Sequence, residues 1–330
     1  MTDLLRIGTR GSALALAQTR AIAKALGAAS GREVELVTVT THGDTSRESL
    51  SALGGTGVFA SALRDALLEE RCDAVVHSLK DLPTVAVPGL VIGAIPRRAD
   101  ARDVLCARGG LRMAGLPAGT RVGTGSPRRI AQLRQARPDV EVVDIRGNVD
   151  TRLGRVFDLD AADADALDAI ILAAAGLGRL DRADAATDTF SLSDWPTAPG
   201  QGALAIEVRD GDARGRGTLA MALKSVNHVT TNACATAERL VLAGLNAGCS
   251  APIGTTAQFD DGLFFLTATV YKPDGTERIT SSHAATPDAT TLPALLDAAR
   301  DVSARVVTEL LAAGAGELAP SLLSAPGNAS

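Results

Sequence analysis

Aromatic residues and cysteines are scarce in this 330-residue chain, and each scarcity excludes a class of function. One Trp, one Tyr and six Phe are too few for the stacking surfaces that bind single-stranded nucleic acids. A net charge of −5 leaves no general basic surface for phosphate backbones, so we expect no nucleic-acid partner. No two cysteines are separated by two residues, and no histidine stands near them at metal-ligand spacing. Their spacing therefore predicts neither a metal site nor a disulfide framework. They are Cys72, Cys106, Cys234 and Cys249.

Long hydrophobic runs are also missing. No apolar stretch approaches the roughly 20 residues of a membrane span. The run of Ala and Leu at 13–17, after Arg6 and Arg10, is too short for a signal peptide. We therefore expect a cytoplasmic protein with no membrane partner.

Lysine is rare, whereas arginine is the chain's ordinary cation: of 33 basic residues, only Lys24, Lys80, Lys224 and Lys272 are lysines. Most arginines should lie on the solvated surface. Arg10, Arg128 and Arg146 differ, because each stands beside Gly, Ser or Pro at a predicted turn from a strand to a helix. Ligands of α/β folds bind at such strand ends, and several guanidinium groups there predict a small polyanion, such as a polycarboxylate.

One acid stands among these cations. Asp81 follows Lys80 at the end of the apolar run 74–79. It is a candidate for the chemistry, although an aspartate after a strand also serves as a turn cap.

Short apolar runs alternate with longer amphipathic segments along the chain, which indicates an α/β fold. The length predicts two or three domains. Predicted strands are Leu4–Gly8, Val34–Thr40, Ala74–His77, Arg121–Thr124, Val140–Asp144, Ala169–Ala173, Ala203–Val208 and Phe264–Tyr271. Predicted helices are Ser12–Leu26, Phe59–Glu70, Pro127–Arg137, Asn148–Phe157, Thr230–Leu242 and Leu295–Ala313. The small, Pro- and Gly-rich residues 314–330 are expected to be disordered.

Two loops lack periodicity. The glycine-rich stretch His42–Gly57 is either a mobile lid or an ordinary surface loop. Cys249 lies in a loop bounded by Gly and Pro, where a thiol is more often exposed and reactive, although a buried packing role stays open.

The turn Gly123–Gly125 follows a strand and opens a helix, as a dinucleotide-binding turn does. Arg128 stands where the third glycine of that motif belongs, which counts against a nucleotide. A carboxylate suits the loop better, because the helix N-terminus offers N–H groups, Ser126 a hydroxyl, and Arg128 and Arg129 guanidinium groups.

With these residues in place, the chain closely resembles the porphobilinogen deaminase family, also called hydroxymethylbilane synthases. The shared motifs cover most of the first 254 residues in the family's order. They are Arg6–Ser12, Val76–Pro83, Gly123–Arg129, Arg146–Asn148, Pro199–Gly202 and Gly248–Cys249.

The resemblance implies a cytoplasmic monomer with two domains like type II periplasmic binding proteins and a smaller α+β C-terminal domain. The expected bounds are 1–98 with 200–220, 99–199 and 221–313. It implies a transferase that joins four porphobilinogens head to tail, with loss of ammonia, on a dipyrromethane cofactor held by a thioether to Cys249.

The resemblance also implies residue roles. Asp81 is the expected catalytic carboxylate. The other expected cofactor-binding residues are Lys80, Thr124, Ser126, Arg128, Arg129 and Arg146. The expected substrate-binding residues are Arg10, Ser12, Phe59, Arg152 and Arg179. No metal is implied. Ala52 and Thr56 stand where many relatives have lysines, which puts direct pairing of the lid with carboxylates in doubt.

Two other classes would share some of these features. A solute-binding protein of the type II fold needs the anion-binding loops but no Cys249, and it is normally exported. A nucleotide-dependent oxidoreductase needs the missing glycine.

Overall fold

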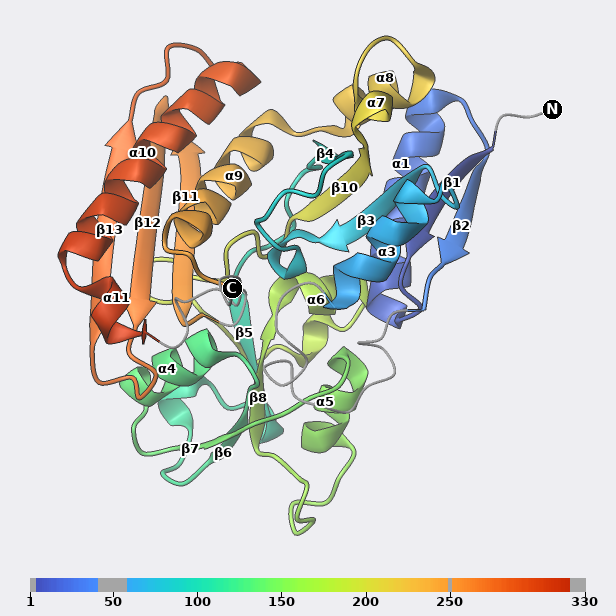
Figure 1. Cartoon of the computed structure of the whole chain (residues 1–330). Helices are drawn as coiled ribbons and strands as arrows, with labels where there is room; N and C mark the ends of the chain where they lie inside the picture. The colour runs from blue at the N-terminus through green and yellow to red at the C-terminus, as the bar shows by residue number, and fades with distance from the viewer. Residues whose placement is uncertain (1–3, 41–57, 249–250, 321–330) are drawn as a thin grey trace, which may run out of the picture.

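The computed structural model describes residues 4–40, 58–248 and 251–320. Three sheets organise the chain, as Figure 1 shows: two lie in α/β units, and a smaller one, in orange and red, lies beside them. The first sheet has the order β2-β1-β3-β10-β4. Its strands are β1 (Leu5–Thr9), β2 (Val34–Thr38), β3 (Ala74–Ser78), β4 (Leu90–Ala94) and β10 (Leu204–Arg209).

The second sheet repeats this pattern, with the order β7-β6-β8-β5-β9. In each sheet three parallel strands are followed by an antiparallel strand, β10 in the first and β5 in the second. The chain passes between the sheets twice, along residues 95–102 and 190–203, which we call the crossovers. The strands of the second sheet are β5 (Asp103–Ala107), β6 (Arg121–Gly123), β7 (Glu141–Val143), β8 (Ala169–Ala173) and β9 (Asp188–Thr189).

Alternating strand residues bury both faces of the first sheet. Ala74 and Val76 of β3 pack with the helices α1 (Ala13–Ser30) and α8 (Thr218–Val226), whereas Val75 packs with α3 (Val58–Leu68). A short helix, α7 (Asp210–Ala213), precedes α8. Ser12 accepts a hydrogen bond from the backbone of Ala15 and so caps α1, as its place in the sequence predicts.

The second sheet is covered in the same way. One face packs with α5 (Val149–Phe157) and α6 (Ala174–Arg179), and the other with α4 (Pro127–Ala136). Asn148 caps α5 and Pro127 begins α4, and both are favoured residues at those positions. Single 3₁₀ turns complete the unit at Arg108–Gly110, Met113–Gly115 and Ala183–Ala185.

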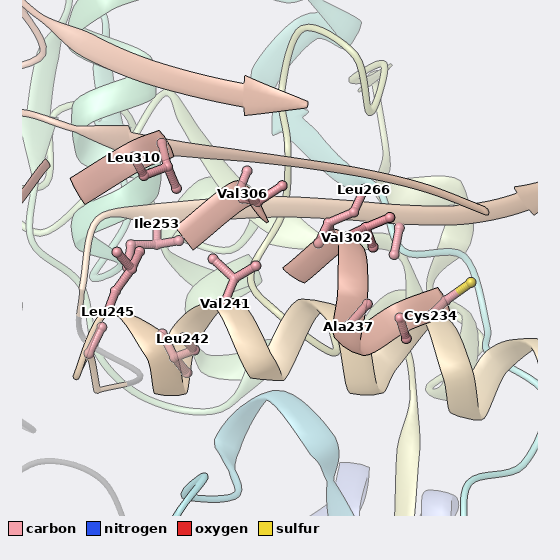
Figure 2. Packing of buried hydrophobic residues seen from close by; sticks show 14 of the residues in the cluster. Cys234, Ala237, Val241, Leu242, Leu245, Ile253, Leu266, Val302, Val306 and Leu310 are labelled. Atoms are coloured by element: carbon pink, nitrogen blue, oxygen red, sulfur yellow. The ribbon is translucent and has the colours of Figure 1, made fainter. Parts of the chain in front are cut away.

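The third unit is an antiparallel sheet with two long helices on one face. Its strands, in the order β11-β12-β13, are β11 (Ile253–Asp260), β12 (Leu263–Tyr271) and β13 (Arg278–Ala285). Its helices are α9 (Val229–Gly244), α10 (Leu292–Ala312) and the short α11 (Ala315–Leu318). Figure 2 shows side chains of α9, α10 and the sheet meeting in one core, among them Val241, Val306 and Leu266.

The expected fold class is confirmed: an α/β chain with two similar sheet domains and a smaller α+β unit. Two details were wrong. Residues 315–318 form α11, and Ala315 and Ala319 are buried in the third core, so the expected disorder does not apply to 314–320. The boundary expected at residue 220 falls inside α8, whose Leu219, Ala222 and Leu223 pack in the first core. No helix among the described residues is long and apolar enough to cross a membrane.

Candidate active site

Strand β3 ends in a single 3₁₀ turn, η1 (Leu79–Asp81). Leu79 is fully buried, and its backbone N–H donates to the carbonyl of Ala203 at 3.0 Å. Because Leu79 anchors the turn inward, Lys80 is half-buried and Asp81 is exposed. Asp81 makes no hydrogen bond or ion pair with the described residues, so the turn leaves its carboxylate available.

The loop from β6 to α4 carries the predicted Thr124 and Ser126. Thr124 is buried, and its Oγ1 accepts a hydrogen bond from the backbone N–H of Ser126 at 3.3 Å. Gly125 passes so close to the backbone of Ile145 that a Cβ there would lie 2.6 Å from the carbonyl oxygen. The Ser126 hydroxyl does not cap α4, although Ser126 stands at the N-cap position. It stays free of the helix at an N-terminus that favours anions.

Asp103, at the start of β5, lies at the centre of the second unit's charges. Its carboxylate accepts from Arg128 Nη1 at 2.9 Å and from Arg129 Nη2 at 2.6 Å. Gln201 Nε2 and Trp195 Nε1, both on the second crossover, donate to it at 2.8 and 3.1 Å. Burial alone would raise the pKa of Asp103, but the two guanidinium groups hold it below the usual range. Asp103 therefore stays ionised and fixes both arginines.

Around α5 the arginines are held less tightly. Arg146 is exposed and makes no hydrogen bond or ion pair with the described residues. Arg152 is half-buried, and its Nε donates to the carbonyl of Gly147 at 2.8 Å. Burial, together with the charges of Arg129 and Arg146, lowers the pKa of Arg152 to about 10. Asp144 and Asp81 act in the opposite direction, so Arg152 lies among charges of both signs.

Electrostatics show that the two units face each other here. The pKa of Lys80 is lowered by burial and by Arg129 and Arg128, while Asp81 and Asp103 act in the opposite direction. The negative charge of Asp81 in turn raises the pKa of Arg152, against the effect of burial. The structure thus brings together the Lys80–Asp81 turn and most of the predicted arginines. We call this set the cation cluster: Lys80, Arg128, Arg129, Arg146 and Arg152.

Three predicted residues have other contacts. The Ser12 hydroxyl is used as the cap of α1. Arg179 donates from Nη2 to the carbonyl of Gly202 at 2.7 Å, and burial lowers its pKa to about 10. Arg10 is half-buried at the end of β1. None of the three is among the charges that shift the pKa of Lys80 or Arg152, so the structure does not itself place them in the cation cluster.

Some predicted positions lie outside the described residues. They are Cys249 and the stretch His42–Gly57, with Ala52 and Thr56. Phe59 belongs to α3, but its side chain is likewise outside the description. In the chain, Cys249 falls on the connection from α9 to β11.

Sequence reasoning missed the residues that hold the crossovers. Glu238 of α9 is fully buried and pairs with Arg98 through two hydrogen bonds of 2.7 and 3.0 Å. The same carboxylate accepts from the backbone N–H groups of Gly200 and Ala257. A weak signal was present for Asp103 and Glu238: each is an acid within an otherwise apolar or small-residue segment, where a charge needs a partner.

The described residues contain no group of three His, Cys, Asp or Glu side chains able to hold a metal ion. A pocket of about 400 Å³ lies between α9 and β11, and another of about 310 Å³, lined in part by Thr84 and Arg239, lies between the first and third units. Neither is lined by Asp81 or by the cation cluster. The converging charged side chains, rather than the volume of these pockets, mark the candidate site.

Comparison with known proteins identifies the family of the chain. Residues 5–216 match the family described as porphobilinogen deaminase, dipyrromethane cofactor binding domain, and residues 232–311 match the porphobilinogen deaminase C-terminal domain. The chain is 68% identical over 316 residues to the porphobilinogen deaminase of Leifsonia xyli subsp. xyli, covering 96% of this chain and 94% of that one. It is 46% identical over 319 residues to that of Thermobifida fusca, covering 96% of each. A solved methionine-binding protein, MetQ, is a distant likeness at 10% identity and a TM-score of 0.42, covering 68% of this chain and 91% of its own.

Proposed function

The chain belongs to the porphobilinogen deaminase family, and on this premise we propose that Asp81 and the cation cluster form its catalytic and carboxylate-binding site. The enzyme is a transferase of tetrapyrrole biosynthesis: it joins four porphobilinogens head to tail, releases ammonia, and yields the linear hydroxymethylbilane. Its cofactor is a covalently bound dipyrromethane. The single observation that carries the site assignment is the convergence of Lys80 and Asp81 with the arginines of the second unit.

The chemistry of the cation cluster fits such a cofactor. Each pyrrole carries an acetate and a propionate, so two linked pyrroles present four carboxylates. Arg146 has no partner among the described residues, and burial together with neighbouring arginines lowers the pKa values of Lys80 and Arg152. Carboxylates supply the charge that this cluster lacks. When bound, the cofactor supplies the primer to which new pyrroles are added.

We assign the binding residues in two groups. Lys80, Thr124, Ser126, Arg128, Arg129 and Arg146 hold the cofactor, which is joined to Cys249. Arg10, Ser12, Arg152, Arg179 and Phe59 bind the substrate and the growing chain. The internal partner Asp103 uses only part of the donors of Arg128 and Arg129, since a guanidinium offers five N–H groups.

Asp81 supplies the charge that the reaction needs. Its free carboxylate pairs with the ammonium of the substrate's aminomethyl group. When the carbon–nitrogen bond breaks, ammonia leaves with the electron pair and a cation remains on the substrate. Asp81, held at the same place, then stabilises that cation. A fixed carboxylate that makes no ion pair with the described residues is suited to this task.

Replacement of Asp81 tests the assignment. Asp81→Asn keeps the size of the side chain but removes its charge, so each condensation should slow by about 10²- to 10³-fold. Intact-mass spectra of enzyme mixed with substrate should show wild-type protein climbing a ladder of adducts, one deaminated pyrrole per step. Asp81→Asn should stop on the lowest steps.

The matched control is Asp65→Asn, which removes the same charge from an exposed position on α3. It should climb the ladder at the wild-type rate. If Asp81→Asn also did so, Asp81 would be a turn residue and the proposed site would be wrong.

The cofactor separates this function from simple anion binding. Cys249→Ser should fold but lack both the dipyrrole and activity, because a hydroxyl is a far weaker nucleophile than a thiolate. An anion-binding protein would carry no covalent dipyrrole. Intact mass and the colour reaction of the pyrrole with Ehrlich's reagent distinguish the two.

We further propose a cytoplasmic monomer that needs neither nucleic acid nor a membrane. Its three domains comprise residues 4–98 with 200–226, residues 99–199, and residues 227–320, because α8 packs in the first core. Size-exclusion chromatography with light scattering tests the monomer.

A further inference from the structure

Arg239, on α9 of the third unit, contacts the backbone of the turn that carries Lys80 and Asp81. Its Nη1 donates to the carbonyls of Leu79 and Leu82, at 3.2 and 2.6 Å. Its Nη2 donates to the carbonyl of Pro83 at 2.8 Å. These carbonyls lie on both sides of Lys80 and Asp81 in the chain, so one guanidinium holds the segment that presents them.

The turn needs such support. η1 is a single 3₁₀ turn, closed by one backbone hydrogen bond of 3.2 Å from Leu82 to Leu79. The carbonyls of Leu82 and Pro83 have no partner within so short a turn, and the Arg239 guanidinium donates to both. The other side of the turn is packed by the crossover, where Gly200 stands against the side chain of Leu79.

The helix that carries Arg239 is itself firmly held. Its neighbour Glu238 is fully buried and bound to Arg98, Gly200 and Ala257. Adjacent residues of α9 therefore hold the crossovers on one side and the Asp81 turn on the other. The same helix ends at Gly244, shortly before Cys249 in the chain. Figure 1 shows α9 between the outer helix α10 and the first sheet.

From these contacts we infer that Arg239 is a positioning residue for catalysis: it sets the place of Asp81 relative to the unit that carries the cofactor. The inference rests on the proposed role of Asp81. The contacts that carry the inference run from Arg239 to backbone carbonyls, so it acts on Asp81 through the turn.

A positioning role predicts a particular kinetic pattern. A displacement of about 1 Å at a reacting group costs roughly 100-fold in rate. Loss of Arg239 should therefore lower kcat by about 10- to 100-fold. KM should change little, because the arginines that bind carboxylates are untouched. Cofactor loading should stay complete for the same reason.

The test compares Arg239→Met, Arg239→Lys and a matched control, Arg108→Met, in full-length enzyme. Arg108 is also half-buried, and it donates to two backbone carbonyls, those of Leu159 and Leu167. All three residues belong to the second unit. The readouts are kcat, KM, dipyrrole content by intact mass, and Tm. Arg239→Met should lose kcat with loading and KM near wild type, and Arg239→Lys should recover part of the loss because it restores a cation at the turn.

Arg108→Met should lower Tm comparably and leave kcat unchanged. The inference fails if Arg239→Met keeps wild-type kcat, or if its loading and KM collapse together with kcat, which would mark a merely structural role. If Arg239→Met fails to fold, Arg239→Lys carries the test, and wild-type kcat there with an unchanged pH profile overturns the inference.

The Asp81→Asn enzyme separates this inference from the proposed function. If Asp81→Asn is inactive and Arg239→Met is normal, only the positioning role is wrong. If Asp81→Asn is fully active, the proposed function of the site is wrong, whatever the Arg239 variants show.

Discussion

The arginines of α4 and those around α5 belong to one cluster, yet the protein holds them in opposite ways. Arg128 and Arg129 are only 2% and 6% exposed, and both bind Asp103. Arg146 is exposed without a partner among the described residues, and Arg152 binds only a backbone carbonyl. The difference is whether the countercharge is part of the fold.

This contrast has an energetic meaning. Burying Arg128 and Arg129 is costly, and Asp103 offsets that cost during folding, so the pair is in place before a ligand arrives. Arg146 and Arg152 make no ion pair with the described residues, so their guanidinium groups are available to a carboxylate ligand. Changes on the α4 side should therefore appear first in stability, and changes on the α5 side first in binding.

Asp103→Asn should have the largest effect on stability. It leaves two buried guanidinium groups without their countercharge, which typically costs about 3–5 kcal/mol. Urea unfolding should show a loss of that size. The control Asp100→Asn also removes an arginine partner, Arg102, but at an exposed position, and should cost no more than about 1 kcal/mol. Equal losses in the two variants would contradict the special role of Asp103.

We also expect the stability difference between wild type and Asp103→Asn to depend on pH. The folded pKa of Asp103 lies below the unfolded value of about 3.9, so its contribution to stability is complete above that pH and is lost as pH falls toward the folded pKa. Asn does not titrate. The gap in unfolding free energy between wild type and Asp103→Asn should therefore be constant near neutrality and narrow below about pH 4. A gap that widened in acid would reverse the assigned sign.

Arg146→Gln should show the opposite pattern. Because the side chain is exposed and unpaired among the described residues, stability should change by no more than about 0.5 kcal/mol. A lost hydrogen bond to a charged group is worth about 1.5–3 kcal/mol, or roughly 10- to 100-fold in affinity. Dipyrrole loading and KM measure that loss. Normal loading and normal KM would make Arg146 an ordinary surface residue.

Local signals in the sequence were enough to predict the residues of the proposed site. An apolar run ending in Lys80 and Asp81, a capped helix after Ser12, and arginines beside glycines at strand ends each depend on neighbours in the chain. The strand β13 was missed because its polar sequence is stabilised by pairing with β12, a tertiary contact. The pairing within the cluster was missed for the same reason. Asp103 binds Arg128, 25 residues away in the sequence, and Gln201, 98 residues away. Local sequence patterns cannot predict contacts between residues so far apart in the chain.

The pKa of Lys80 depends on the charges of the cation cluster. Its pKa is lowered by burial and nearby arginines, whereas that of Lys272 is raised by Glu277 and Asp274. In Cys249→Ser protein, which should lack cofactor, the rate of reductive methylation should therefore rise at lower pH for Lys80 than for Lys272. Peptide mass spectra measure each rate. Asp103→Asn should move the Lys80 midpoint lower still, since Asp103 raises that pKa; an upward movement would contradict the arrangement.

The smallest effect is expected behind α4, where the third unit supports the paired arginines. Gln132 accepts from Arg128 Nη1 at 2.7 Å and donates from Nε2 to the Tyr271 hydroxyl at 3.1 Å. Tyr271→Phe removes that acceptor, but Gln132 still donates to the carbonyl of Pro196, so the cost should be about 0.5–1.5 kcal/mol. Thermal unfolding measures it, with kcat and dipyrrole loading unchanged. If loading fell while stability held, the place of Arg128 would depend on the third unit, and the α4 arginines would be less firmly set by Asp103 than their burial indicates.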